Sequence, residues 1–333
     1  MALFFLLAAA LAAPPSQHQR YLTWAERLEQ TEHPEPGYRF LSDMHSEIAE
    51  VVREKPGVVT PVRIGHTVQK RPIWGFKIRD PIRPPKKKIL VFAGLHALEW
   101  VGVEAVVEYI LALAGHPVEG VEATAIPVVN VDRRRLVEEE LLNGVRKYRR
   151  SNHNGVDLNR DYAIHREAKA IWSPLMPARF ATSPAPLSQP ESRAIDRIAA
   201  REGYSAAVSL HCFGGYIYYP WAGRYERPED WQELDAIGRK MKAAQPGRHP
   251  YRVKQLSHWM FLFRAQGSEI DHLYHTYGIP SFLLEMSRSG IVPGKPRTWR
   301  DPFRMYNPSD PTHHARMGAD ALMALTRHLG EDQ

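Results

Sequence analysis

The sequence predicts an α/β fold, a single domain built on a mixed, mostly parallel central sheet with helices on both faces. Its clearest unit is residues 88–93, where Ile89 to Ala93 are all apolar, as in a fully buried strand. A segment of helical periodicity, residues 99–114, follows this strand and is ended by a glycine and a proline. The same alternation of short apolar runs and helical patterns continues along the chain, which is typical of a sheet covered by helices.

The other elements are predicted on the same grounds. Short apolar or alternating segments are predicted as strands over 61–64, 72–78, 123–130, 204–211, 216–219 and 279–284. Segments with apolar residues three or four positions apart are predicted as helices over 39–54, 191–202, 229–244 and 312–329. Two proline-rich segments, 173–190 and 292–311, are predicted as surface loops, because the strand pattern continues on both sides of each.

The N-terminal segment precedes the predicted domain and differs from it in composition. Residues 1–13 are predicted to be a signal peptide, since their apolar core is too short to span a membrane and Ala10-Leu-Ala12 supplies a cleavage pattern. The segment lacks the usual positive charge, so an imprecise translation start is the alternative. Residues 14–37, polar and rich in proline, are predicted to be a linker or a surface arm. Residues 38–333 are then predicted to form the main domain, secreted or periplasmic if the signal functions.

Composition narrows the possible partners. The chain has 44 basic and 37 acidic side chains, a net charge of +7. Its arginine clusters, 133–135 and 146–150, lie on no recognisable nucleic-acid module and lack interleaved stacking aromatics, so no nucleic-acid partner is expected. No later segment approaches about 18 consecutive apolar residues, so no membrane span is expected. Cys212 is the only cysteine, which excludes an intramolecular disulfide.

Three His-x-x-Glu pairs occur, and only one lies where an α/β sheet binds ligands. The pattern is short enough to arise by chance, so position must decide between His96/Glu99, His116/Glu119 and His328/Glu331. The last two pairs lie beyond a predicted helix end and near the C-terminus, where solvent-exposed charges are ordinary. His96 and Glu99 follow a predicted buried strand, at its carboxyl end. These two residues are therefore candidate metal ligands.

A third ligand is predicted at the end of another strand. His211 closes the strand predicted over 204–211. A lone histidine there is more often a core residue, but another strand end of the same sheet already offers two ligands. Two histidines and one glutamate leave the fourth position of a tetrahedral zinc open, as in catalytic sites. Cys212 follows directly, but consecutive strand side chains point to opposite faces, so it is not expected to be a ligand.

From about Tyr38 to Glu285 the chain resembles the zinc carboxypeptidases of the carboxypeptidase A and B type. The resemblance rests on short motifs that occur in the family's order. They are Ile64-Gly-x-Thr67-x-x-x-Arg71-Pro-Ile73, Leu95-His-Ala-Leu-Glu-Trp100, Arg146-Lys-Tyr-Arg-Arg150, Gly155-Val-Asp-Leu-Asn-Arg160, Ser188-Gln-Pro-Glu191, Ser209-Leu-His211, Gly267-Ser-Glu-Ile-Asp271 and Ser281-Phe-Leu-Leu-Glu285.

The resemblance implies one Zn²⁺ per chain, bound by His96, Glu99 and His211. Asp157 would hold His96 from behind and set its tautomer. The alternative for Asp157 is a helix or turn cap.

The resemblance also implies residues that act on the substrate. Asn159 and Arg160 would bind its terminal carboxylate, which suits the planar guanidinium of arginine. Arg146 would stabilise the oxyanion of the tetrahedral intermediate. Glu285 follows an apolar strand, and composition alone leaves an ion-pair partner or a catalytic base open. The resemblance favours the base, which would pass a proton from the metal-activated water to the leaving amine.

A pocket for the terminal side chain is implied as well. Phe263 stands where the family usually has a tyrosine that caps the substrate, so the ring is kept and the hydroxyl lost. Ile270 matches the position that faces the terminal side chain, and Leu262 and Leu283 match others in that pocket. Burying an unpaired cation among aliphatic residues is unfavourable, so apolar or aromatic C-terminal residues are expected. Glu269 is the alternative determinant, if its side chain turns inward to receive a basic residue.

The function implied is hydrolysis of the C-terminal peptide bond of peptides or proteins. Cleavage of cell-wall muropeptides by a related zinc peptidase is an alternative, but Asn159 and Arg160 together favour a free C-terminal carboxylate. A zinc-free binding module is disfavoured, because the three ligands and the base are all present. The expected partner is a peptide or protein with a free C-terminus, and the sequence predicts no oligomeric state.

Overall fold

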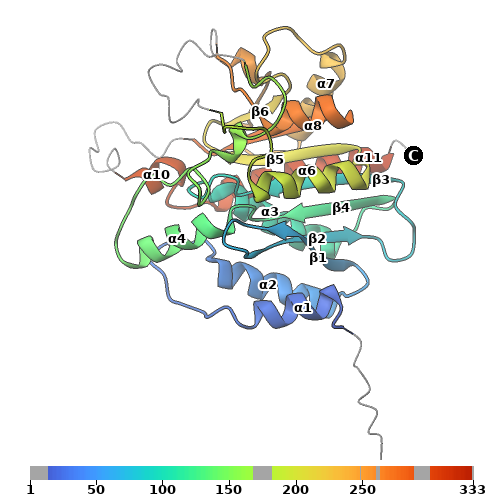
Figure 1. Cartoon of the computed structure of the whole chain (residues 1–333). Coiled ribbons are helices and arrows are strands. Elements are labelled where there is room, and N and C mark those ends of the chain that lie inside the picture. The colour runs from blue at the N-terminus through green and yellow to red at the C-terminus, as the bar shows by residue number, and fades with distance from the viewer. Residues whose placement is uncertain (1–13, 168–181, 248, 260–262, 289–300, 332–333) are drawn as a thin grey trace, which may run out of the picture.

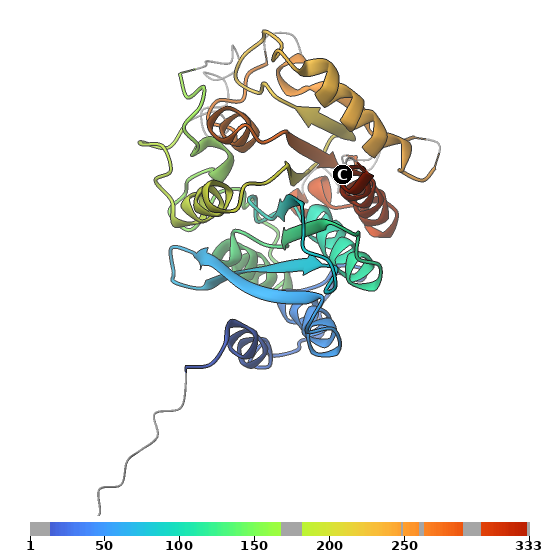
Figure 2. The ribbon, with the colours of Figure 1, turned by 90° about the vertical axis from the view of Figure 1, so that its right-hand side faces the viewer.

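An eight-stranded mixed sheet runs through the middle of the molecule, with helices on both faces (Figure 1, Figure 2). The computed structural model describes residues 14–167, 182–247, 249–259, 263–288 and 301–331, and the signal peptide predicted over 1–13 lies outside them. The predicted fold class, a single α/β domain, is confirmed. Across the described ranges, no helix has both the length and the apolar composition needed to cross a membrane.

The strands lie in the order β1-β2-β4-β3-β5-β8-β6-β7. The central strands β4, β3, β5 and β8 pair in parallel, while β1 and β2 at one edge, and β6 beside β8, pair antiparallel. β7 completes the other edge in parallel with β6. The bounds are β1 Val59–His66, β2 Pro72–Arg79, β3 Lys87–Ala93, β4 Val121–Ile126, β5 Ala206–Cys212, β6 Tyr216–Tyr219, β7 Arg252–Gln255 and β8 Ser281–Met286.

Side chains of the central strands alternate between two apolar layers. Ile89 and Val91 of β3 belong to an apolar cluster that includes residues of α2, α3, α7 and α11, whereas Leu90 and Phe92 belong to a second cluster that includes residues of α6 and α8. The helices are α1 Gln17–Ala25, α2 Leu41–Glu54, α3 Val101–Gly115, α4 Val131–Leu142, α6 Pro190–Glu202, α7 Trp231–Ala243, α8 Glu269–Tyr277, α10 Pro302–Tyr306 and α11 Thr312–Glu331.

The elements predicted from periodicity are present, with ends that differ by a few residues. The largest difference is the strand predicted over 123–130, since β4 ends at Ile126 and Asn130 caps α4. The sequence does not predict β7, α1, α4, α8 or α10, and α10 interrupts the loop predicted over 292–311. The first half of the other predicted loop, residues 173–181 of 173–190, lies outside the described residues.

Residues 14–37, predicted to be a linker or a surface arm, instead pack partly against the domain. α1 begins after Ser16, whose side chain accepts a hydrogen bond from Gln19 N, and it lies against α2 and β1. Tyr21 is fully buried, with its ring edge-on to those of Trp74 and Phe76. The helix is short and mostly polar, so its apolar pattern is too weak to be recognised in the sequence.

Candidate metal centre

Three candidate ligands meet at the carboxyl ends of β3 and β5, two adjacent parallel strands. His96 and Glu99 lie in the connection between β3 and α3, and His211 lies in β5. α3 crosses β5 closely at Gly102, where a Cβ atom would come within 2.9 Å of the Leu210 Cβ. A glycine at this position therefore lets α3, and the loop that precedes it, approach the strand that carries His211.

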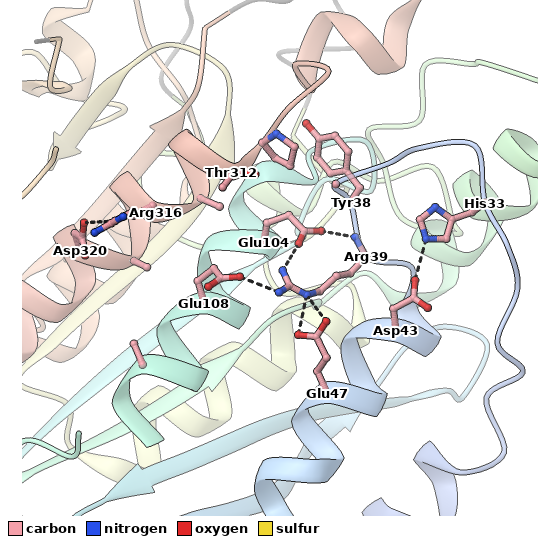
Figure 3. Close-up of a pocket in the computed structure, with 15 residues that line it drawn as sticks. His33, Tyr38, Arg39, Asp43, Glu47, Glu104, Glu108, Thr312, Arg316 and Asp320 are labelled. Carbon is pink, nitrogen blue, oxygen red and sulfur yellow. Dashed lines mark hydrogen bonds and ion pairs between the residues drawn. The ribbon is translucent and has the colours of Figure 1, made fainter. Parts of the chain in front are cut away.

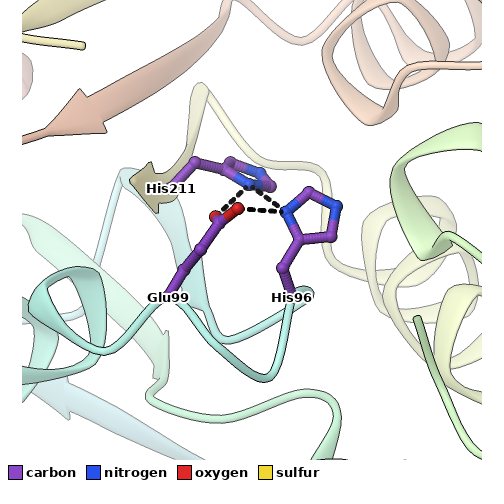
Figure 4. A group of neighbouring side chains, drawn as sticks. All are labelled: His96, Glu99 and His211. Carbon is purple, nitrogen blue, oxygen red and sulfur yellow. Dashed lines mark hydrogen bonds and ion pairs between the residues drawn. The ribbon is translucent and has the colours of Figure 1, made fainter. Parts of the chain in front are cut away.

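The three side chains are buried and point toward one another (Figure 4). His96 Nδ1 lies 2.9 Å from Glu99 Oε1, and His211 Nδ1 lies 3.0 Å from His96 Nδ1 and 3.1 Å from Glu99 Oε2. Ligands of a tetrahedral zinc are separated by roughly 3.3 Å when each lies about 2 Å from the metal. The donor set and its spacing thus fit Zn²⁺, and this is the one such group found among the described residues.

Each imidazole has a buried carboxylate on the side opposite its Nδ1 atom. Asp157 Oδ1 lies 2.8 Å from His96 Nε2, so the predicted contact between these two residues is confirmed. Glu269 Oε1 lies 3.1 Å from His211 Nε2, a contact that the sequence does not predict. Burial alone would raise the pKa of Glu269, but the hydrogen bond and charge of His211 lower it below its usual value.

Arg150 lies beside two carboxylates of this site, those of Glu99 and Asp157. Its Nη1 donates to Glu99 Oε1 at 3.2 Å, and its Nε donates to Asp157 Oδ2 at 2.7 Å. Burial would raise the pKa of Asp157, but the Arg150 charge and His96 hold that pKa well below its usual range. The pKa of Glu99 is likewise lowered, because His96 and His211 outweigh the effect of burial. The guanidinium of Arg150 is thus held next to the candidate ligands by two ionised carboxylates.

Arg146, predicted to stabilise the oxyanion, is bonded elsewhere. Its Nη2 donates to Glu35 Oε1 at 2.5 Å, and its Nη1 lies 3.3 Å from Asp301 Oδ2. Glu35 is fully buried and also pairs with Arg304. Over the described part of the chain, no hydrogen bond or ion pair joins Arg146 to the candidate ligands. The structure therefore brings Arg150, rather than Arg146, to the three candidate ligands, which we call the metal group. The sequence alone does not distinguish between these two neighbouring arginines.

Glu285 lies on β8 beside His211 of β5, because the two parallel strands pair these residues in register. Its Oε2 atom is buried and has no hydrogen-bond partner among the described residues. Burial and the nearby charge of Glu99 raise the pKa of Glu285 to about 8. A carboxyl with such a pKa can take up or release a proton near neutral pH, as a general acid or base must.

Asn159 and Arg160 are buried in a short 3-10 turn, Leu158–Arg160, that lies against the start of α8. Asn159 Oδ1 accepts a hydrogen bond from Glu269 N at 3.2 Å, and Arg160 Nη1 donates to the Asn159 carbonyl at 2.5 Å. Gly267, with a φ of +60°, permits this approach, since a Cβ atom there would lie 2.8 Å from the Arg160 carbonyl oxygen. Asn159 therefore adjoins the residue that contacts His211, and Arg160 lies beside Asn159 in the same turn.

Ile270 lies in a small apolar cluster at the start of α8. It is 1% exposed, and Phe263 packs at the edge of the cluster, with its ring 4.9 Å from that of Trp259. Leu262, predicted to line the same pocket, lies outside the described residues. The buried members of the cluster are Tyr218, Ala222, Leu256, Ala265, Ile270 and Leu283.

Glu269 is directed toward the metal group instead of toward this apolar cluster. It is 0% exposed, and Ser209 Oγ donates to its Oε1 at 2.7 Å, beside the contact with His211. A carboxylate engaged in this way is not placed to receive a basic substrate side chain. The contacts of Glu269 therefore do not favour it as the alternative determinant, and Ile270 stays the predicted one.

A separate cavity of about 710 Å³ lies between α2, α3 and α11 (Figure 3). None of the three candidate ligands lines it. Its charged side chains already pair with one another: Arg39 with Glu47, Glu104 and Glu108, His33 with Asp43, and Arg316 with Asp320. We therefore place the functional site at the metal group.

A buried His-Glu-His group at the strand ends of an α/β sheet is the arrangement of a metal-dependent hydrolase. The sequence profile of the zinc carboxypeptidase family matches residues 44–305, most of the chain. The chain therefore belongs to the zinc carboxypeptidase family, and it is a metallocarboxypeptidase.

Individual relatives are distant but similar over most of their length. Carboxypeptidase O of Bos taurus is 24% identical over 275 residues, which cover 76% of this chain and 71% of that protein. Carboxypeptidase A2 of Mus musculus is 24% identical over 294 residues, covering 79% and 68%.

Solved structures show the same fold. The thrombin-activatable fibrinolysis inhibitor of cattle, in complex with tick carboxypeptidase inhibitor, matches with a TM-score of 0.71 at 21% identity, over 89% of this chain and 98% of that one. Carboxypeptidase A of Helicoverpa armigera matches with a TM-score of 0.70 at 19% identity, over 94% and 80%.

Proposed function

We propose that this metallocarboxypeptidase removes the C-terminal residue of peptides, using one Zn²⁺ held by His96, Glu99 and His211, and prefers apolar or aromatic C-terminal side chains. The observation that carries the proposal is the convergence of these three ligands beside Glu285. Zinc, when bound, supplies a Lewis acid that polarises a carbonyl group and lowers the pKa of a water molecule.

Two residues of the chain act on the reacting atoms in this proposal. Glu285 takes a proton from the attacking water and delivers it to the amine that leaves, which suits its raised pKa. Arg150 stabilises the negative charge that develops on the carbonyl oxygen, because its contact with Glu99 holds its guanidinium beside the site. We therefore move the oxyanion role from Arg146 to Arg150.

Two groups of the substrate's terminal residue are recognised, its carboxylate and its side chain. Asn159 and Arg160 bind the free carboxylate, for which a buried guanidinium is well suited. The side chain enters the apolar cluster around Ile270 and Leu283, with Phe263 at the edge. An exopeptidase with this arrangement requires a free C-terminal carboxylate.

Zinc analysis and peptide hydrolysis test the proposal together. The purified protein should contain one zinc per chain and release Phe from a peptide with a free C-terminus, but not from the same peptide with an amidated C-terminus. A chelator should abolish the activity, and added zinc should restore it. Peptides that end in a D-residue, as in bacterial cell walls, should be poor substrates, and a preference for them would favour the muropeptide alternative.

The zinc content of alanine variants tests the assignment of the zinc ligands. A double variant with His96→Ala and His211→Ala should lose the bound zinc, whereas His116→Ala, in a second His-x-x-Glu pair, should keep it. Undiminished zinc in the double variant would show that the metal is held elsewhere.

A further inference from the structure

Glu269 is a carboxylate buried against the back of His211. Its Oε1 lies 3.1 Å from His211 Nε2 and accepts a hydrogen bond from Ser209 Oγ at 2.7 Å, while Ser268 Oγ lies 3.2 Å from Oε2. The residue is 0% exposed, and among the described residues its one salt bridge is with His211. A carboxylate without water around it is destabilised unless its oxygens accept hydrogen bonds, so the contact with His211 is a main reason that it can stay buried.

The contact with the Glu269 carboxylate determines which nitrogen of the His211 imidazole faces the other two ligands. An ionised carboxylate accepts hydrogen bonds and cannot donate them, so His211 Nε2 must carry the hydrogen. In a neutral imidazole that binds a metal, Nδ1 then carries the lone pair, and this is the atom that lies 3.1 Å from Glu99 Oε2 and 3.0 Å from His96 Nδ1. Asp157 contacts Nε2 of His96 in the same manner. Both histidines are thus held with Nδ1 toward a common point.

We propose that Glu269 is a positioning residue for His211, which fixes the tautomer and orientation of the imidazole and thereby strengthens zinc binding. The inference rests on the proposed zinc ligands and adds a second carboxylate–histidine pair to the one formed by Asp157. Carboxylates that contact the outer nitrogen of a histidine ligand typically contribute about 10- to 100-fold to metal affinity.

The backbone of Glu269 has a contact separate from that of its side chain. An effect of the side chain on zinc binding can therefore be distinguished from an effect on substrate binding. Its N–H donates to Asn159 Oδ1 at 3.2 Å, and Asn159 is a proposed carboxylate-binding residue. A side-chain substitution at Glu269 leaves this backbone hydrogen bond in place. The variants should therefore lose zinc affinity while KM for a peptide, measured at saturating zinc, stays close to the wild-type value.

The test is a series of zinc affinities measured by competition with a chromophoric chelator. Glu269→Gln keeps a hydrogen-bond acceptor but loses the charge, and should weaken zinc binding about tenfold; Glu269→Ala loses both and should weaken it about 100-fold. The matched control is Asp196→Asn, which alters another His–carboxylate pair, His272 Nε2 to Asp196 Oδ1 at 2.8 Å, outside the metal group. This control should change zinc affinity by less than about threefold.

A spectroscopic readout separates positioning from loss of folding. In the ¹⁵N-labelled, zinc-loaded protein, the Nε2–H signal of His211 should exchange slowly in the wild type and in Asp196→Asn, and be lost in Glu269→Ala. Wild-type zinc affinity no higher than that of the His96→Ala, His211→Ala double variant would overturn the proposed zinc site itself. A normal wild-type affinity with an equal affinity in folded Glu269→Ala would overturn only the role of Glu269.

Discussion

Arg150 donates a hydrogen bond to Glu99 across 3.2 Å, which places a permanent positive charge next to the group of three candidate ligands. Asp157 accepts a second hydrogen bond from the same guanidinium, at 2.7 Å, and also contacts His96. The arginine is therefore oriented by carboxylates that themselves belong to the metal centre. A charge held in this way needs little reorganisation when negative charge develops on a substrate carbonyl.

Substitution of Arg150 should lower turnover far more than substitution of Arg146. Loss of a donor to the oxyanion costs about 10²–10³ in kcat, so Arg150→Ala should lose about that much and change KM less. Arg146→Ala should leave kcat nearly unchanged, because Arg146 pairs with Glu35 and Asp301. Steady-state kinetics on zinc-loaded proteins provides the measurement. An equal or larger kcat loss in Arg146→Ala would return the oxyanion role to that residue.

Glu285→Gln should keep zinc and lose catalysis. The amide cannot take the proton from the attacking water, and removal of a general base costs about 10²–10⁴ in rate. Zinc content and kcat should be measured on the same preparation. Glu202→Gln, which alters a glutamate paired with Lys77 and Lys88 away from the metal group, serves as the control and should retain wild-type kcat. Near-normal turnover in Glu285→Gln would exclude Glu285 as the base.

Peptides that end in Phe should be cleaved better than identical peptides that end in Arg. The apolar cluster around Ile270 and Leu283 offers no charge for a guanidinium, so kcat/KM should differ by at least about 100-fold. Ile270→Asp should shift the preference toward Arg, whereas Ile270→Val should preserve it. A wild-type preference for Arg would instead assign the pocket to Glu269.

Arg39 should be required for stability, because it balances the charge of a buried glutamate. Its guanidinium bonds to Glu104, which is 1% exposed, and to the more exposed Glu47 and Glu108 (Figure 3). Arg39→Met should lower the free energy of unfolding by about 3 kcal/mol in denaturant titrations. Arg53→Met, which removes an exposed pair with Glu26, should cost less than about 1 kcal/mol. Equal losses in the two variants would contradict this account.

Much of the fold could be predicted because its central elements carry strong periodic patterns. β3, β5 and β8 are short and mostly apolar, and α2 and α11 have apolar residues on one face. Helices α4 and α8 are not predicted, for two different reasons. α4 is dominated by charged residues, so no apolar stripe stands out. α8 has only nine residues, and its buried first half mixes polar and apolar side chains.

The sequence by itself determined the types of the candidate metal ligands and their positions at strand ends. His96, Glu99 and His211 follow from that placement, since parallel strands bring their carboxyl ends to one edge of the sheet. Only the tertiary structure decided which arginine of 146–150 reaches Glu99, and where the Glu269 carboxylate points. Side-chain direction depends on neighbours distant in sequence: Glu35 and Asp301 draw Arg146 away, while Ser209 and His211 engage Glu269. Such contacts leave no periodic trace along the chain, so they become visible only once the elements are packed.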